Sequence, residues 1–148
     1  MRNEQYGVEI SDELMTFDFI SEGPKGLIRK RIEYRLIDEV NVYNLGFGDL
    51  NIETNAIDDR VISNNNDSQK VLSTVASTVY TFTEKYSDAI VFAQGSNAVR
   101  TRLYRIGISN NLEELTEKFE VQGFLLNIGW VVFEKNTDYL AFYIKRKK

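Results

Sequence analysis

The residue types that most often carry nucleophilic and metal chemistry are missing from this chain, which has no cysteine and no histidine. Their absence excludes thiol nucleophiles, Ser-His-Asp and Cys-His arrangements, and zinc sites of the usual kind. Carboxylates, tyrosines, lysines and hydroxyls remain. Asp38 and Glu39 are neighbours that would point to opposite faces of a strand, which does not suit a glycosidase pair. We expect no metal site, because Asp58, Asp59 and Asp67 have no recognisable ligand spacing.

Arginines supply the clearest candidate for binding chemistry. Arg100, Arg102 and Arg105 form the densest positive cluster on a predicted helix, so they are the candidate anion-binding residues. The alternative is a solvated face held by ion pairs. More arginines alternate along a predicted strand, and together these faces could contact phosphates. With 18 basic and 22 acidic residues the net charge is -4, so we expect nucleic acid not to be a partner.

Length and composition indicate what kind of domain positions these residues. A chain of 148 residues that is 43% hydrophobic is typical of one globular domain, here residues 1–148. It is long enough to bury a core without a disulfide or metal. No apolar run approaches the roughly 20 residues of a membrane span, and no signal-peptide pattern follows Met1. We expect a cytoplasmic protein that does not enter a membrane.

The first third of the chain predicts an antiparallel meander. Apolar residues alternate with polar ones over residues 14–20, 27–37 and 40–52. A glycine-proline turn at residues 23–26 separates the first two strands. In the second strand, we expect a buried face and an outward face. The buried face is Ile28, Ile32, Tyr34 and Leu36, and the outward face is Arg29, Arg31 and Arg35. Gly46 and Gly48 in the third strand suggest a bulge or a close backbone approach.

Helical spacing begins at Ser68. There, Val71, Leu72, Val75, Val79, Phe82 and Tyr86 would form one stripe. Asn66 is the predicted cap, and Gln69 would complete a capping box.

Residues 89–93 then predict a short strand, and Ser96 would cap a second helix with Val99, Leu103 and Ile106 at helical spacing. Asn111 and Glu114 predict another capping box, which opens a short helix.

The last two apolar runs, residues 130–133 and 139–144, are separated by a polar loop and predict a hairpin. Strand, helix and strand in the middle of the chain indicate a locally parallel pair. The predicted fold class is α+β, with a mixed, mostly antiparallel sheet and helices packed on its faces.

Three stretches resemble those of a family of uncharacterised bacterial proteins known only as a domain of unknown function. They are residues 43–49, residues 71–76, and Gly95-Ser96 followed by residues 100–104. The resemblance covers nearly the whole chain. It implies a small cytoplasmic bacterial protein and carries no known activity.

The order of elements and the segment 97–108 also resemble the Gcn5-related acetyltransferase superfamily, which uses acetyl-coenzyme A. Asn97, then Leu103-Tyr104, then Gly107-Ile108 carry the likeness. It implies that Asn97 lies near the cofactor arm and that Tyr104 is the general acid that protonates the leaving thiolate, a role that a phenol can fill. The spacing from Tyr104 to Gly107 is one residue shorter than usual, and Ile108 replaces an aromatic residue.

The superfamily also holds the cofactor pyrophosphate on a glycine-containing loop at the start of a helix. The equivalent residues here would be Asn65, Asn66 and Ser68, and asparagine tolerates the left-handed backbone that such a loop needs. However, residues 64–68 contain no glycine and no arginine, and Asp67 would repel phosphate.

We therefore expect a non-enzymatic or catalytically degenerate acetyltransferase-like domain that binds a small-molecule ligand or a protein partner and needs no cofactor. The first alternative is an active acyl-coenzyme A-dependent N-acyltransferase, with acetyl-coenzyme A as cofactor. The second is a nucleic-acid-binding protein.

Overall fold

The first half of the sheet is the predicted meander. The computed structural model describes residues 2–38, 40–58 and 63–148. Strands β2 (Thr16–Gly23), β3 (Gly26–Asp38) and β4 (Val42–Asn51) pair antiparallel in sequence order, and the short β1 (Glu9–Ile10) lies outside β2. Pro24 and Lys25 form the turn between β2 and β3. Gly26 has a φ of 89°, which glycine adopts without strain.

The faces of β3 largely follow the predicted alternation. Ile32 and Tyr34 are buried, and Arg29 and Arg35 are exposed. The prediction that Leu36 is buried is wrong. Its side chain is exposed, although its position falls on the apolar face. It lies next to the register shift between Leu36 and Asp38, where β3 leaves the regular ladder.

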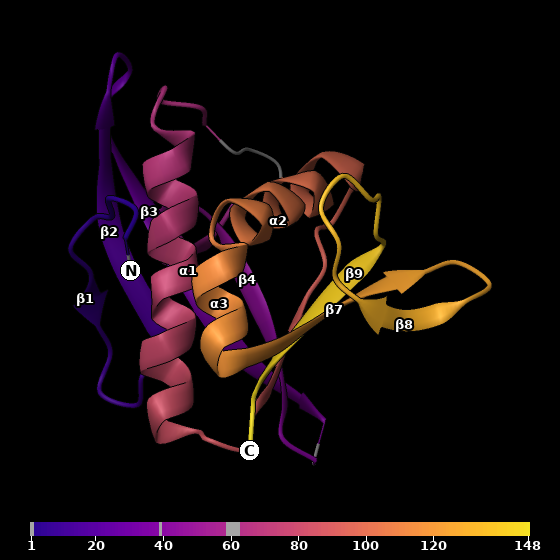
Figure 1. The fold of residues 1–148 in the computed structure, drawn as a ribbon. Helices are drawn as coiled ribbons and strands as arrows, with labels where there is room; N and C mark the ends of the chain where they lie inside the picture. Colours follow the sequence, from indigo (N-terminus) through magenta and orange to yellow (C-terminus); the bar gives the residue numbers. More distant parts are fainter. Residues whose placement is uncertain (1, 39, 59–62) are drawn as a thin grey trace.

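The second half of the sheet adds one parallel and several antiparallel pairs (Figure 1). Strand β6 (Ile90–Ala93) lies parallel to β4 and antiparallel to β9 (Ala141–Arg146). Strand β7 (Phe119–Leu125) lies between β9 and β8 (Gly129–Val132), antiparallel to both. The order is β1-β2-β3-β4-β6-β9-β7-β8, with β5 (Ala56–Ile57) paired to β4. The mixed, mostly antiparallel sheet is confirmed.

Three helices cover one face of this sheet: α1 (Ser68–Lys85), α2 (Ala98–Asn110) and α3 (Leu112–Lys118). Aromatic side chains pack α1 and α2 against the sheet. Phe82 of α1 stacks on Tyr34 with ring centroids 4.0 Å apart, and Tyr104 of α2 contacts Phe47 edge-on with centroids 5.8 Å apart. Offset and edge-on aromatic pairs of this kind add to the stabilisation from apolar burial. The apolar stripe predicted for α1 is buried from Val71 to Phe82.

The predicted helix caps are wrong in detail. Asp67, not Asn66, is the residue that precedes α1, and its carboxylate makes no capping bond, so there is no capping box with Gln69. Asn97, not Ser96, caps α2, and its side-chain oxygen accepts a hydrogen bond from the Arg100 N–H at 2.9 Å. Asn111 precedes α3 without a side-chain capping bond.

The buried face of α2 also differs from the predicted stripe. Val99 is exposed, whereas Arg100, Tyr104, Gly107 and Ile108 are buried. Packing selects this face: a Cβ on Gly107 would lie 3.3 Å from Leu72 Cβ, so the missing side chain lets α2 lie close to α1.

The predicted C-terminal hairpin is wrong as well. Residues 130–133 and 139–144 do not pair with each other, because β7 lies between β8 and β9. Strand β7 begins at Phe119 directly after α3, and residues 119–123 alternate buried and less buried positions as a strand does.

Candidate functional site

A cleft opens where β4 and β6 separate. The two strands pair only over residues 42–44 and 90–92, and β4 continues to Asn51 without β6 beside it. The cleft has a volume of about 370 Å³. We call it the β4–β6 cleft. Its lining includes Glu33 and Arg35 of β3, Asn44 and Gly46 of β4, Gly95 and Ser96 after β6, and Arg100 and Tyr104 of α2.

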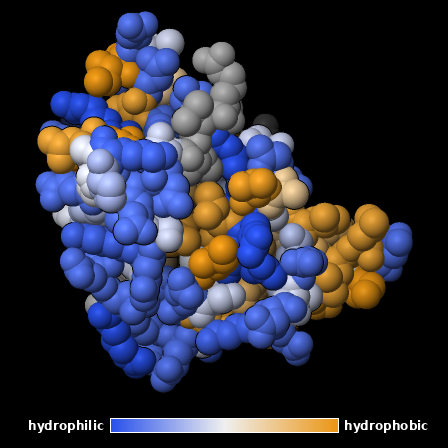
Figure 2. Space-filling model, turned by 90° about the horizontal axis from the view of Figure 1, so that it is seen from above, coloured by the Kyte–Doolittle hydropathy of each residue, from blue (hydrophilic) through white to orange (hydrophobic). Residues whose placement is uncertain are grey.

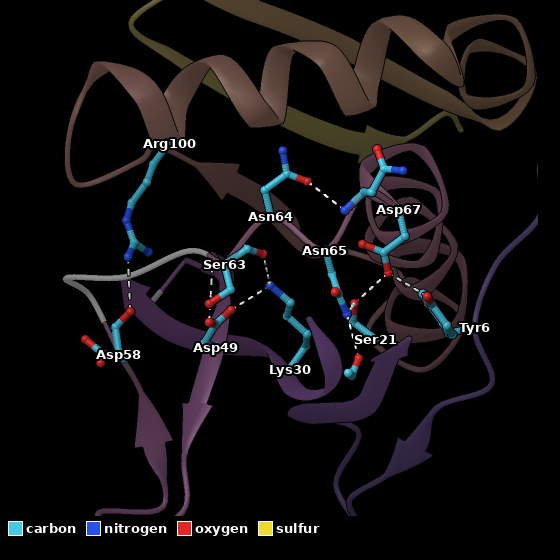
Figure 3. A network of polar contacts seen from close by, with 12 residues as sticks. Tyr6, Ser21, Lys30, Asp49, Asp58, Ser63, Asn64, Asn65, Asp67 and Arg100 are labelled. Atoms are coloured by element: carbon cyan, nitrogen blue, oxygen red, sulfur yellow. Dashed lines mark hydrogen bonds and ion pairs between the residues drawn. The ribbon is translucent and has the colours of Figure 1, made fainter. Parts of the chain in front are cut away.

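Arg100 is the charged group that the fold buries at this site. Its residue is only 8% exposed, and its guanidinium donates to the backbone carbonyl of Asp58 at 3.0 Å (Figure 3). This is the one acceptor that the described residues offer to its five N–H groups, and none of their carboxylates forms an ion pair with it. A buried charge without a carboxylate partner is costly, and an anionic ligand would relieve that cost.

Tyr104 lines the same cleft from the next turn of α2. Its hydroxyl donates to the Leu45 carbonyl of β4 at 3.1 Å. Burial raises the pKa of this phenol to about 12. The hydroxyl therefore anchors α2 to the sheet as a neutral donor at ordinary pH.

The free edge of β4 beyond the cleft is covered by the chain itself. Strand β5 pairs there, with Leu50 opposite Ile57, and the Asp58 N–H donates to the Asp49 carbonyl at 2.8 Å. A Cβ on Gly48 would meet Ile57 at 2.9 Å, which is the close approach expected for this glycine; the β3–β4 register is continuous here, so there is no bulge.

The loop from β6 into α2 is equally tight. A Cβ on Gly95 would lie 2.3 Å from the Thr101 nitrogen and 2.4 Å from Arg100 Cβ. The Gly95 N–H donates to the Thr101 hydroxyl at 3.1 Å. This glycine thus brings the loop against the first turn of α2 and sets the rim of the cleft.

A second polar cluster, at the start of α1, is satisfied within the protein (Figure 3). Asp67 accepts hydrogen bonds from Tyr6 and Ser21, each at 2.5 Å. Asn65 is buried, accepts from the Lys25 N–H at 2.8 Å and donates to the Gly26 carbonyl at 2.9 Å. These bonds join the loop before α1 to the turn between β2 and β3.

Lys30 is a buried residue that sequence reasoning missed. Its residue is 1% exposed, and its ammonium contacts Asp49 at 2.6 Å and the Ser63 carbonyl at 2.9 Å. The signal was present, because Lys30 lies at an even position between Ile28 and Ile32, on the face predicted to be buried. A lysine in such a stripe indicates a buried ion pair.

The other predicted site residues lie outside the β4–β6 cleft, in separate parts of the structure. Asn97, Arg102 and Arg105 line a separate depression that Arg100 does not line, so the three arginines of α2 do not converge. Arg105 is paired with Asp138 at 3.0 Å, and Arg102 is exposed. Asn66 and Ser68 lie exposed beside Asp67, away from Tyr104.

The described lining of the β4–β6 cleft therefore combines hydrogen-bond donors with the buried positive charge of Arg100, while Glu33 and Arg35, which also line it, form an ion pair at 3.3 Å. Among the described residues that line it, no hydrogen bond joins a nucleophilic hydroxyl to a carboxylate base, the arrangement that activates a nucleophile for covalent catalysis.

The comparison with known protein families matches residues 2–147 to a family of unknown function, DUF6934. The chain belongs to this family. The match confirms the expected likeness to a family without an assigned activity; a bacterial source stays a prediction. The comparisons with curated proteins and with solved structures found no match. Among the described residues, no helix of this DUF6934 member has the length and apolarity needed to span a membrane.

Proposed function

We propose that this chain is a ligand-binding domain with an acetyltransferase-like arrangement that does not catalyse acyl transfer, and that its ligand is a small oxyanion, a carboxylate or a phosphate, held in the β4–β6 cleft. The observation that carries the proposal is Arg100, a buried guanidinium that lines the cleft and has a single carbonyl acceptor among the described residues.

Two features support the acetyltransferase-like part. The sheet opens between parallel β4 and β6 after only three paired residues, and α2 contributes Arg100 to the lining of this opening. Tyr104, the residue matched to the general acid of the superfamily, lines the opening.

Three other features favour the loss of coenzyme A binding. The edge of β4 beyond the cleft is occupied by β5. Asp67 places a carboxylate at the start of α1, where a pyrophosphate would need N–H donors and positive charge. The Tyr104 hydroxyl is bonded to the Leu45 carbonyl instead of being free to deliver a proton.

The test is thermal unfolding in the presence of acetyl-coenzyme A, inorganic phosphate or acetate. A ligand that binds only the native state stabilises by RT ln(1 + [L]/Kd), about 2.7 kcal/mol at a hundredfold excess over Kd. We expect phosphate or acetate to raise the melting temperature at constant ionic strength, and acetyl-coenzyme A at millimolar concentration to leave it unchanged.

Three variants locate the effect. Arg100→Gln removes the charge, and Gly46→Val narrows the cleft where a Cβ meets nothing nearer than 3.9 Å. Arg102→Gln is the matched control, an exposed arginine on the same helix. Loss of the anion effect in the first two and its retention in the control would support the proposal. An equal effect in all three would refute it.

The alternative is an active acyl-coenzyme A-dependent transferase, which the position of Tyr104 favours. If acetyl-coenzyme A binds, Tyr104→Phe should lower turnover while affinity stays nearly unchanged, as expected for a group that acts mainly in the transition state.

A further inference from the structure

The sheet ends on one side in an exposed edge strand. Strand β8 is the last in the strand order, and among the described strands it pairs only with β7 (Figure 1). The β7–β8 hairpin projects from the body, and Figure 2 shows this projection as an apolar lobe. Its edge residues Ile128, Trp130 and Val132 are 71%, 40% and 72% exposed.

The backbone of β8 presents hydrogen-bonding groups to solvent at defined positions. The Phe133 N–H donates to the Val121 carbonyl at 3.0 Å, so in this ladder the odd-numbered residues of β8 face β7. Because these groups alternate along an antiparallel strand, Trp130 and Val132 direct their N–H and C=O groups outward. The Val132 carbonyl also receives a long bond, 3.5 Å, from the Tyr139 hydroxyl, which leaves one lone pair.

This edge lacks two of the features that normally prevent edge-to-edge pairing. Charged side chains and proline protect many exposed edges. Residues 121–133 contain neither a charge nor a proline, although 27% of the chain is charged. At the other end of the sheet, β1 has only two residues, one of them Glu9. With a net charge of -4 two copies carry charge of the same sign, and an edge without charged side chains is a place where they can approach without bringing like charges together.

We propose that β8 pairs antiparallel with β8 of a second copy of this chain, around a two-fold axis at Val131. This register places Trp130 opposite Val132 of the other copy, twice by symmetry. Both positions carry outward backbone groups, so each pair forms the hydrogen-bonded type. A large aromatic residue then lies opposite a small β-branched one, a favourable cross-strand pair.

The side chains near this edge are already ordered for such a contact. Trp130 packs edge-on against Phe92, Phe124 and Tyr143, with centroids between 5.0 and 6.2 Å. The aromatic cluster lies on the sheet face opposite the helices, so pairing would extend this face across both copies. A contact limited to one short strand is small, and we expect a reversible dimer.

Sedimentation velocity of the full chain, from about 10 µM to about 1 mM, tests the proposal. We expect the mean mass to rise from that of a 17.1 kDa monomer toward twice that value. Val132→Lys should weaken association by about tenfold or more, because it places a charge beside Trp130 of the other copy. Val132→Thr keeps the β-branched shape without a charge and should associate like the wild type.

Leu27→Lys is the matched control, since Leu27 is 71% exposed and lies on β3, outside the β8 edge. A wild-type chain that stays monomeric at all concentrations would overturn the proposal. So would dimerisation that Val132→Lys leaves intact, or equal loss in Leu27→Lys. Binding to phosphatidylcholine vesicles without self-association would assign the apolar edge to a lipid surface instead and would also refute it.

Discussion

The Lys30–Asp49 pair connects β3 and β4 to Ser63, which precedes α1. The Lys30 side chain is buried and that of Asp49 is partly buried, and Asp49 also accepts the Ser63 N–H at 3.1 Å. Because the ammonium bonds the Ser63 carbonyl as well, one lysine holds the end of β4 and the loop before α1 together.

We expect Lys30→Met to destabilise the protein by about 3 kcal/mol, because it leaves the partly buried Asp49 carboxylate without its cation. Urea denaturation measures the loss. The double variant Lys30→Met with Asp49→Asn should recover part of it, since no unpaired charge remains. A single variant within about 1 kcal/mol of the wild type would show that the pair contributes little.

The buried tyrosines predict a dependence of stability on alkaline pH. Burial raises the pKa of Tyr104 to about 12 and also raises that of Tyr34, while in the unfolded chain both phenols ionise near the ordinary phenol pKa of 10.0. Above pH 10 the unfolded state therefore binds fewer protons than the native state, and stability falls as pH rises. Below pH 9 these two groups should leave stability unchanged.

Urea midpoints of the wild type and of Tyr104→Phe at pH 8, 10 and 11 check this expectation. The variant should lose about 1 kcal/mol at pH 8, because the bond to Leu45 is gone. It should then decline less steeply with pH than the wild type. Parallel declines would show that Tyr104 does not contribute to the alkaline loss.

At the scale of elements, the β6–α2 loop controls the shape of the cleft. Gly95→Ala would force backbone and Cβ atoms of Arg100 and Thr101 to move, because they lie within 2.6 Å of the added carbon. We expect a loss of about 2–3 kcal/mol, as for overpacking. Gly7→Ala, where nothing lies within 4 Å, is the control for the glycine substitution itself. Thermal or urea unfolding of both variants distinguishes them, and equal stabilities would contradict the close approach.

Elements with strict alternation or a continuous apolar stripe were predictable from sequence. β2, β3, β4, β6 and α1 are of this kind, because one periodic face is buried in each. The face of α2 was not, since the buried residues include Arg100 and Gly107, which pattern rules assign to a surface or a break. The position of β7 between β8 and β9 depends on long-range pairing, which no local signal fixes.

The candidate site was also predictable only in part. Arg100 and Tyr104 were identified by residue type and share one cleft, whereas Arg102, Arg105 and the asparagines before α1 lie elsewhere. The cleft arises because β4 extends beyond the three residues that pair with β6, and because β5 pairs with the end of β4. No short sequence motif encodes these strand pairings.

At the scale of the whole molecule, several arginines form ion pairs with carboxylates of the same chain. Arg31 pairs with Asp18 at 2.7 Å, Arg35 with Glu33 at 3.3 Å and Arg105 with Asp138 at 3.0 Å. With a net charge of -4, we expect weak or no binding to duplex or single-stranded nucleic acid near physiological salt. A titration at two ionic strengths checks this. Submicromolar affinity that is lost when the exposed Arg29 and Arg102 become alanine would make nucleic-acid binding the leading function.

Backbone amide NMR during titration with inorganic phosphate at constant ionic strength tests the central claim most directly, that the β4–β6 cleft is the ligand site. We expect saturable shifts at Gly46, Gly95 and Ser96, which line the cleft. These shifts should disappear in Arg100→Gln and persist in Arg102→Gln. Saturable shifts confined to the start of α1, at Asn66 and Ser68, would place the anion where acetyltransferases hold their cofactor and would contradict the account.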